Sequence, residues 1–129
     1  ITSGANCIAQ RATIAALEAP VDKIQYMIDE FAKRREMIIG LLINIPGFKM
    51  NQPQGAFYVF PDISYYFGKT IQGKTISSAS DFSMFLLEEA NVATVTGEAF
   101  GNNACIRISY AASVEDIQEA VKRIAKSLK

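Results

Sequence analysis

The sequence predicts an α+β fold, in which helices cover one side of a small mixed or antiparallel sheet of three to four strands. Three observations lead to this prediction. Residues 20–45 carry apolar side chains at the three- and four-residue steps of one long helix. Short apolar runs typical of strands follow Pro46, and two Ser-x-x-Asp capping boxes open later helices.

The first 45 residues are predicted to be helical. A helix is expected from about residue 5 to residue 18, and its small side chains indicate close packing against another surface. Pro20 suits the first turn of the next helix, because a proline there loses no hydrogen bond. At 1.5 Å per residue this second helix would be about 38 Å long. Such a length favours a helix that joins two domains, and a long surface helix is the alternative.

After Pro46 the pattern changes to strands, turns and shorter helices. Strands are expected at residues 48–51, 56–60, 92–95 and 104–113. Residues 65–77 are interpreted as a loop, because they mix two glycines with polar side chains. The capping boxes at residues 78–81 and 113–116 each predict a helix. Residues 97–101 are interpreted as a loop that leads into the last strand.

Composition and charge limit the class of function. Half of the 129 residues are apolar, and 13 basic side chains balance 13 acidic ones. This balance argues against a nucleic-acid or membrane surface. Histidine is absent, and Cys7 and Cys105 have no metal-ligand spacing, so we predict no metal site and no histidine-dependent nucleophile. Two isolated cysteines without a signal peptide favour a reducing, cytoplasmic location.

Arg107 is the principal candidate for a binding residue. Alternation along residues 104–111 puts Ile106 and Ile108 on one face of a strand and Arg107 on the other, among small side chains. A guanidinium in such a position can pair bidentately with the carboxylate of an amino or keto acid. The alternative is a solvated arginine on a half-exposed strand.

Four segments, in matching order and spacing, resemble the C-terminal part of fold-type-I pyridoxal-phosphate aminotransferases of the aspartate aminotransferase family. Residues 53–58, Pro-Gln-Gly-Ala-Phe-Tyr, resemble the family's Pro-x-Gly-Ala-Phe-Tyr strand. Residues 95–101, Val-Thr-Gly-Glu-Ala-Phe-Gly, resemble its Val-Pro-Gly-x-x-Phe-Gly loop. Residues 106–113, Ile-Arg-Ile-Ser-Tyr-Ala-Ala-Ser, are similar to its arginine strand, and residues 2–10 to the segment after its cofactor lysine.

The resemblance implies a division of the chain and a role for two residues. Residues 1–19 would end a large cofactor-binding domain, residues 20–45 would form an interdomain helix, and residues 46–129 would form the C-terminal small domain. Arg107 would bind the α-carboxylate of the substrate. Phe57 would line the same pocket, and a position in the core is the alternative for its ring.

The resemblance also gives expectations for several other residues in the matched segments, where a structural role explains the residue as well as a functional one. Gly55 and Gly97 are expected to be structural, because a Cβ would obstruct their turns. Thr96 replaces a proline of the family, which predicts a less rigid loop. Thr2 and Ser3 match a loop near the partner subunit's active site, and a helix cap at Ser3 explains them equally well.

The resemblance also implies pyridoxal 5′-phosphate as cofactor, a homodimer, and amino-acid and 2-oxo-acid substrates, aspartate and 2-oxoglutarate first. Tyrosine, alanine, prephenate or another substrate stay open, because all would share Arg107. No lysine matches the family's lysine motif, and no glycine-rich phosphate loop precedes a helix. We therefore expect the catalytic lysine and the cofactor site in residues upstream of this chain, which would be inactive alone.

Two further considerations bear on these expectations. The chain opens at Ile1 without an initiator methionine, which indicates part of a longer protein. The alternative function is a stand-alone α+β module that binds amino acids for regulation or serves in dimerisation. That alternative explains the composition and the capped helices, but neither the long helix nor the four family segments.

Overall fold

A computed structural model describes residues 4–129, so the predictions on Thr2 and Ser3 lie outside the described residues. Two compact units are distinguished, Ile1–Glu30, described from Gly4 onward, and Phe31–Lys129. The hydrophobic core belongs to the second unit. Within the described part of the chain, no helix is both long enough and apolar enough to cross a membrane.

The first helices follow the predicted order with shorter bounds. Helix α1 spans Cys7–Glu18, and the side chain of Asn6 caps it by accepting a 2.8 Å hydrogen bond from the amide of Ile8. Pro20 precedes a 3₁₀ turn, η1 (Val21–Ile24), and α2 spans Gln25–Leu42. The single helix predicted over residues 20–45 is therefore wrong at both ends. Its last turn opens before Pro46, because a proline disfavours helical geometry in the residue before it.

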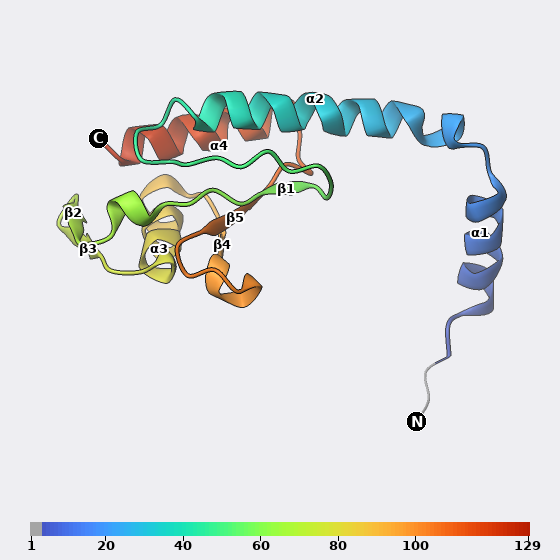
Figure 1. Ribbon diagram of the computed structural model, residues 1–129, viewed down its shortest axis with the longest axis horizontal. Helices are drawn as coiled ribbons and strands as arrows, with labels where there is room; N and C mark the ends of the chain where they lie inside the picture. Colours follow the sequence, from blue (N-terminus) through green and yellow to red (C-terminus); the bar gives the residue numbers. More distant parts are fainter. Residues whose placement is uncertain (1–3) are drawn as a thin grey trace. The chain divides into compact units, whose positions relative to one another are not determined.

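Three short strands form the central sheet, in the order β1 (Tyr58–Val59), β5 (Ile106–Ser109) and β4 (Val95–Thr96) (Figure 1). All pairings are antiparallel. The strand predicted at residues 48–51 contributes only a single bridge, between Lys49 and Asp62. The predicted sheet is therefore present, with most of its strands shorter than expected.

Residues 65–77 do not form the predicted loop. After the 3₁₀ turn η2 (Ser64–Tyr66), β2 (Lys69–Ile71) and β3 (Lys74–Ile76) pair as an antiparallel hairpin. The two turn residues, Gln72 and Gly73, have φ angles of 50° and 81°. Positive φ at both positions is the type I′ geometry, whose twist matches that of the flanking strands. This turn allows strands of only three residues to pair.

The two capping boxes open helices as predicted. Helix α3 spans Ala79–Ala90, and α4 spans Val114–Ser127. The hydroxyl of Ser78 accepts a 3.1 Å hydrogen bond from the amide of Asp81, and Ser113 does the same for Asp116. Between these helices, residues predicted as a loop form the 3₁₀ turn η3 (Gly97–Phe100).

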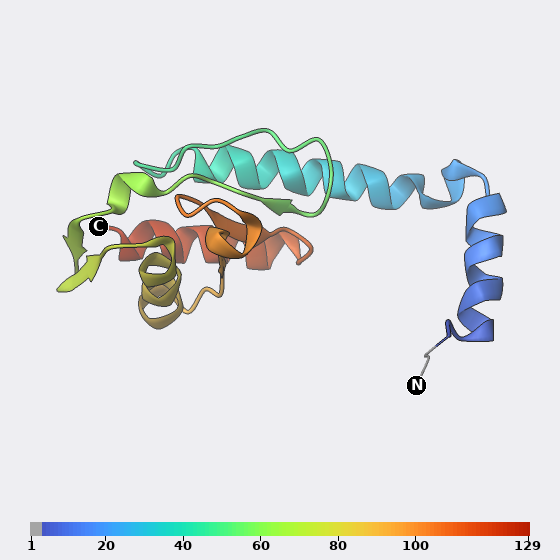
Figure 2. The ribbon, with the colours of Figure 1, turned by 60° about the horizontal axis from the view of Figure 1, so that its bottom comes forward.

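The core lies where α3, α4 and the second half of α2 meet one face of the sheet. Helix α4 runs beside the second half of α2 (Figures 1 and 2), and the Gln118 amide lies 3.8 Å from the Met37 sulfur. Tyr110 and Phe31 pack with ring centres 6.1 Å apart. The prediction that helices cover one side of the sheet is confirmed. The largest fully buried side chains include Tyr110, Phe82, Phe85, Ile38, Leu42 and Ile106.

Candidate functional site

The central strand β5 separates a buried face from a face that carries Arg107. Ile106, Ile108 and Tyr110 are buried, whereas Arg107 is half-buried and Ser109 is exposed. This alternation is the one predicted from the sequence. Cys105 is the exception to this alternation, because it is buried. It precedes the strand and pairs with Asp62 in an isolated antiparallel β-bridge of the backbone. Arg107 therefore lies at the centre of the sheet on its more open face.

Aromatic rings, not the small side chains of its own strand, surround the Arg107 guanidinium. The guanidinium carbon lies 4.4 Å from the centre of the Phe100 ring and 5.3 Å from that of Tyr58. These distances are those of cation–π contacts. The description of Arg107 as standing among small neighbours was therefore wrong. Within residues 4–129, no carboxylate forms an ion pair with Arg107.

Phe57 precedes β1 and is 53% exposed, so its ring does not belong to the core. The ring meets the neighbouring Tyr58 edge-on, with centres 5.9 Å apart. The backbone carbonyl of Phe57 accepts a 2.8 Å hydrogen bond from the Tyr110 amide, which fixes the backbone at Phe57. Tyr58 therefore touches both residues that the sequence singled out, because it contacts the Phe57 ring and the Arg107 guanidinium.

Gly97 and Gly55, both expected to be structural, differ in the structure. A Cβ on Gly97 would overlap the carbonyl oxygens of Asn102 and Cys105, so this prediction is confirmed. A Cβ on Gly55 would meet nothing within 4 Å, and its φ is not positive. The left-handed residue of that turn is Ala56 instead, with a φ of 63°. The structural role assigned to Gly55 is therefore wrong.

Two residues of the site, Tyr58 and Phe100, were missed as functional candidates. Tyr58 lies in residues 53–58 and Phe100 in residues 95–101, both similar to family motifs, but a motif does not show which ring contacts which charged group. Phe100 is 47% exposed and Tyr58 is half-buried, so neither ring is hidden in the core. The partial exposure of two large aromatic rings beside a cation is the feature that marks them as functional candidates. That feature is visible only once the pairing of the strands is known.

Cys105 lies near this site but has the chemistry of a structural thiol. Burial, and after it the nearby Asp62 carboxylate, raise the pKa of Cys105 above its ordinary value. A raised pKa leaves less of the reactive thiolate near neutral pH. Cys105 is therefore no candidate nucleophile.

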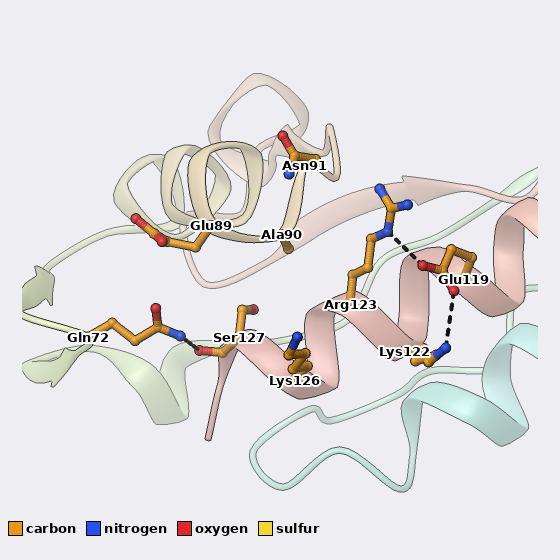
Figure 3. A pocket seen from close by; sticks show the side chains of 9 residues that line it. All are labelled: Gln72, Glu89, Ala90, Asn91, Glu119, Lys122, Arg123, Lys126 and Ser127. Carbon is orange, nitrogen blue, oxygen red and sulfur yellow. Dashed lines mark hydrogen bonds and ion pairs between the residues drawn. The ribbon is translucent and has the colours of Figure 1, made fainter.

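A pocket of about 440 Å³ lies between the end of α3 and the second half of α4, away from Arg107 (Figure 3). Its charges are largely paired with one another. Glu119 accepts a 2.9 Å hydrogen bond from Arg123 and lies 3.5 Å from the Lys122 ammonium. Arg123 first, and then Lys122, lower the pKa of Glu119. Such pairing is typical of a solvated helix surface, so this pocket is not the candidate site.

The residues of this chain do not fit a pyridoxal-phosphate site. Such a site needs a lysine whose amine is deprotonated, usually through burial or a neighbouring cation. Among residues 4–129, every lysine except Lys74 is exposed, and Lys74 is ion-paired with Glu88 and Glu89. Nor does this described part contain a group of three or more His, Cys, Asp or Glu side chains able to hold a metal ion.

A half-buried arginine on the central strand of a small, helix-covered sheet characterises this α+β domain, and sequence comparison identifies its family. The family model for aminotransferase class I and II matches residues 3–124, so the chain belongs to this family. The bifunctional aspartate aminotransferase and glutamate/aspartate-prephenate aminotransferase of Petunia hybrida is 43% identical over 98% of this chain. The aspartate aminotransferase of Rhizobium meliloti is 42% identical over 96% of it.

Solved structures agree with these relatives. The crystal structure of the Rhizobium meliloti aspartate aminotransferase superposes on 98% of this chain with a TM-score of 0.91 and 39% identity. An alanine aminotransferase from Pyrococcus furiosus superposes on 94% with a TM-score of 0.81 and 32% identity. The chain spans 27% of the Petunia protein and 32% of the Rhizobium structure. It therefore corresponds to about a third or less of these relatives.

Proposed function

We propose that this chain is the C-terminal part of a pyridoxal-phosphate-dependent aminotransferase that acts on aspartate and 2-oxoglutarate. Residues 1–19 would end the cofactor domain, residues 20–45 would join the domains, and residues 46–129 would form the small domain. Members of this family use pyridoxal phosphate, which supplies the chemistry of amino-group transfer when bound. Because no lysine described here suits that cofactor, the catalytic lysine would lie elsewhere in the whole protein.

The observation that carries the proposal is the position of Arg107. Its guanidinium lies on the central strand, half-buried between two aromatic rings, and no carboxylate of the described chain forms an ion pair with it. A guanidinium presents N–H donors in a fixed fork that matches a carboxylate. Every amino acid and 2-oxo acid carries such a carboxylate beside its reacting carbon. Arg107 would bind that group and orient the reacting carbon.

Phe57 would border the same substrate space. Its ring is more than half exposed and meets Tyr58, the residue that also contacts Arg107. Phe57 contacts Arg107 only through Tyr58 in the described chain, and an apolar ring at the border of the site would reduce the access of water to an ion pair with a carboxylate. Phe57 would therefore act on substrate affinity and not as an acid or base.

Aspartate is proposed as the amino donor because the relatives named above include aspartate aminotransferases at 42–43% identity. The family match favours this function over a stand-alone module. A homodimer and a cytoplasmic location complete the proposal, and the two free cysteines are compatible with a reducing compartment. Light scattering on the whole protein tests the dimer, and activity with aspartate, alanine, tyrosine and prephenate tests the substrate.

The test of Arg107 uses the whole enzyme and its Arg107→Ala and Arg107→Lys variants. Loss of a charged partner to a carboxylate costs about 2–4 kcal/mol, or roughly 30- to 1,000-fold in kcat/KM. We expect this loss for both the amino acid and the oxo acid, with Arg107→Lys in between. Arg123→Ala is the control, since Arg123 is exposed and, within residues 4–129, its side chain bonds Glu119 alone. Unchanged kinetics in Arg107→Ala would refute the assigned role.

A further inference from the structure

We propose that Phe100 and Tyr58 are positioning residues, which hold the Arg107 guanidinium in the orientation that receives the substrate carboxylate. This inference rests on the proposed function of Arg107 and adds to it the means by which the arginine is preorganised. An arginine side chain loses much rotamer freedom when it is fixed. Contacts that fix it before the substrate arrives remove that cost from binding.

The two rings reach Arg107 from different parts of the chain. Tyr58 lies opposite Ser109 in the β1–β5 pairing, so it is the diagonal neighbour of Arg107 on the same face of the sheet. Phe100 ends the 3₁₀ turn η3, which follows β4, the strand that pairs with β5 at Val95 and Arg107. The guanidinium carbon is 5.3 Å from one ring centre and 4.4 Å from the other. The chain segments on both sides of β5 therefore each place one aromatic ring against Arg107.

The exposure of Phe100 shows that core packing alone does not account for its place. Phe100 is 47% exposed, and within residues 4–129 its ring contacts the Arg107 guanidinium and packs nearly perpendicular to Phe60, with ring centres 6.2 Å apart. An exposed phenylalanine gains less from burial than a core one does. Its contact with a cation offers a specific reason for a ring at this position.

The turn that carries Phe100 is held firmly by backbone contacts. The amide of Gly97 donates to the carbonyl of Cys105 at 2.8 Å, and its own carbonyl accepts from the amide of Asn102 at 3.1 Å. A side chain at Gly97 would overlap these neighbours, so the turn has little freedom to shift. Cys105 is two residues before Arg107. The hydrogen bond between Gly97 and Cys105 therefore ties the turn to the same strand segment that carries the arginine.

Aromatic contacts also leave the binding capacity of the arginine intact. Tyr58 and Phe100 meet the guanidinium carbon with their rings, and neither ring offers a carboxylate or carbonyl to its N–H groups. A carboxylate partner would instead have occupied the donors that a substrate needs. Rings can orient the cation while its N–H groups stay available. This combination suits a site that must bind and release a carboxylate in each cycle.

The test compares Phe100→Leu and Tyr58→Leu with Phe100→Tyr and Tyr58→Phe in the whole enzyme. The leucine variants should raise KM for both amino and oxo acid about 5- to 20-fold, or about 1–1.8 kcal/mol. Their kcat should change less than about twofold, because the lost interaction is made equally in ground and transition states. The aromatic variants should stay within about twofold of the wild type, since they keep the ring. Tyr65→Leu is the matched control, because Tyr65 also contacts a cation, Lys69, but lies outside the site.

A double-mutant cycle with Arg107→Lys separates positioning from a general effect on the fold. If Phe100 acts through the guanidinium, Phe100→Leu should add little once Arg107 has been replaced. An equal KM effect in both backgrounds would overturn the inference, and so would an unchanged KM in Phe100→Leu. In either case a large loss in Arg107→Ala would leave the proposed function standing. Thermal unfolding checks each variant, and Phe100→Met replaces Phe100→Leu if the latter does not fold.

Discussion

The hydroxyl of Tyr110 donates a 2.9 Å hydrogen bond to the carbonyl of Ala56, the residue with a φ of 63° just before Phe57. The Tyr110 amide also bonds the Phe57 carbonyl at 2.8 Å. Left-handed geometry costs a residue with a Cβ about 1–2 kcal/mol. These two bonds hold the turn in that geometry, and they tie the start of β1 to the end of β5.

Tyr110→Phe should therefore destabilise the protein by about 1 kcal/mol, the net value of one hydrogen bond. Urea denaturation measures the change. Ala56→Gly in the same background should recover part of the loss, because glycine adopts positive φ without support. The exposed Tyr26 provides the control variant Tyr26→Phe, for which we expect no change. Equal stability of Tyr110→Phe and wild type would show that the bond does not support the turn.

Thr96 carries a buried hydroxyl oxygen without a hydrogen-bond partner in the described chain. An unsatisfied buried polar group costs about 1–3 kcal/mol. Thr96→Val keeps the shape and removes the hydroxyl, so it should stabilise the protein by about 1 kcal/mol. Thr96→Ser keeps the hydroxyl and loses the methyl, so it should destabilise. A less stable Thr96→Val would mean that the hydroxyl has a partner in solution.

The sequence predicted those parts of the fold that local pattern determines. Ser78 and Ser113 cap their helices because a hydroxyl three residues before an amide is enough to define the motif. Alternation along β5 correctly separated Ile106 and Ile108 from Arg107. The hairpin at residues 69–76 was missed, because Gln-Gly is not among the favoured type I′ pairs and the strands have only three residues.

The environment of Arg107 could not be predicted from its own strand. Tyr58 lies 49 positions before Arg107 in the chain, so only the pairing of β1 with β5 brings the two together. The turn η3 brings Phe100 to the same guanidinium. The sequence could name Arg107 as a candidate, but the identity of its neighbours depends on sheet order and register.

Tyr66 gives the stability a dependence on alkaline pH. Burial, and after it the nearby Tyr65, raise the pKa of Tyr66 to about 12, and its hydroxyl donates to the carbonyl of Pro46. Unfolding returns this pKa to about 10, so between pH 10 and 12 the unfolded state binds fewer protons than the folded state. Stability contributed by Tyr66 is complete below pH 10 and decreases as pH rises toward 12. In urea titrations, the advantage of wild type over Tyr66→Phe should therefore shrink across this range. An advantage that stays constant would contradict the raised pKa.

Gly97→Ala tests whether the backbone at the base of η3 controls both stability and the substrate site. The new Cβ would overlap the carbonyl oxygens of Asn102 and Cys105, and backbone atoms yield less than side chains do. Such overpacking costs about 1–3 kcal/mol, which urea denaturation would detect. Because the same turn carries Phe100, KM for both substrates should rise together with the loss of stability. Gly55→Ala is the matched control in the neighbouring motif, since its Cβ would meet nothing within 4 Å. If Gly97→Ala lost stability without any change in KM, the turn would support the fold alone, and the link from Gly97 through Phe100 to Arg107 would be wrong.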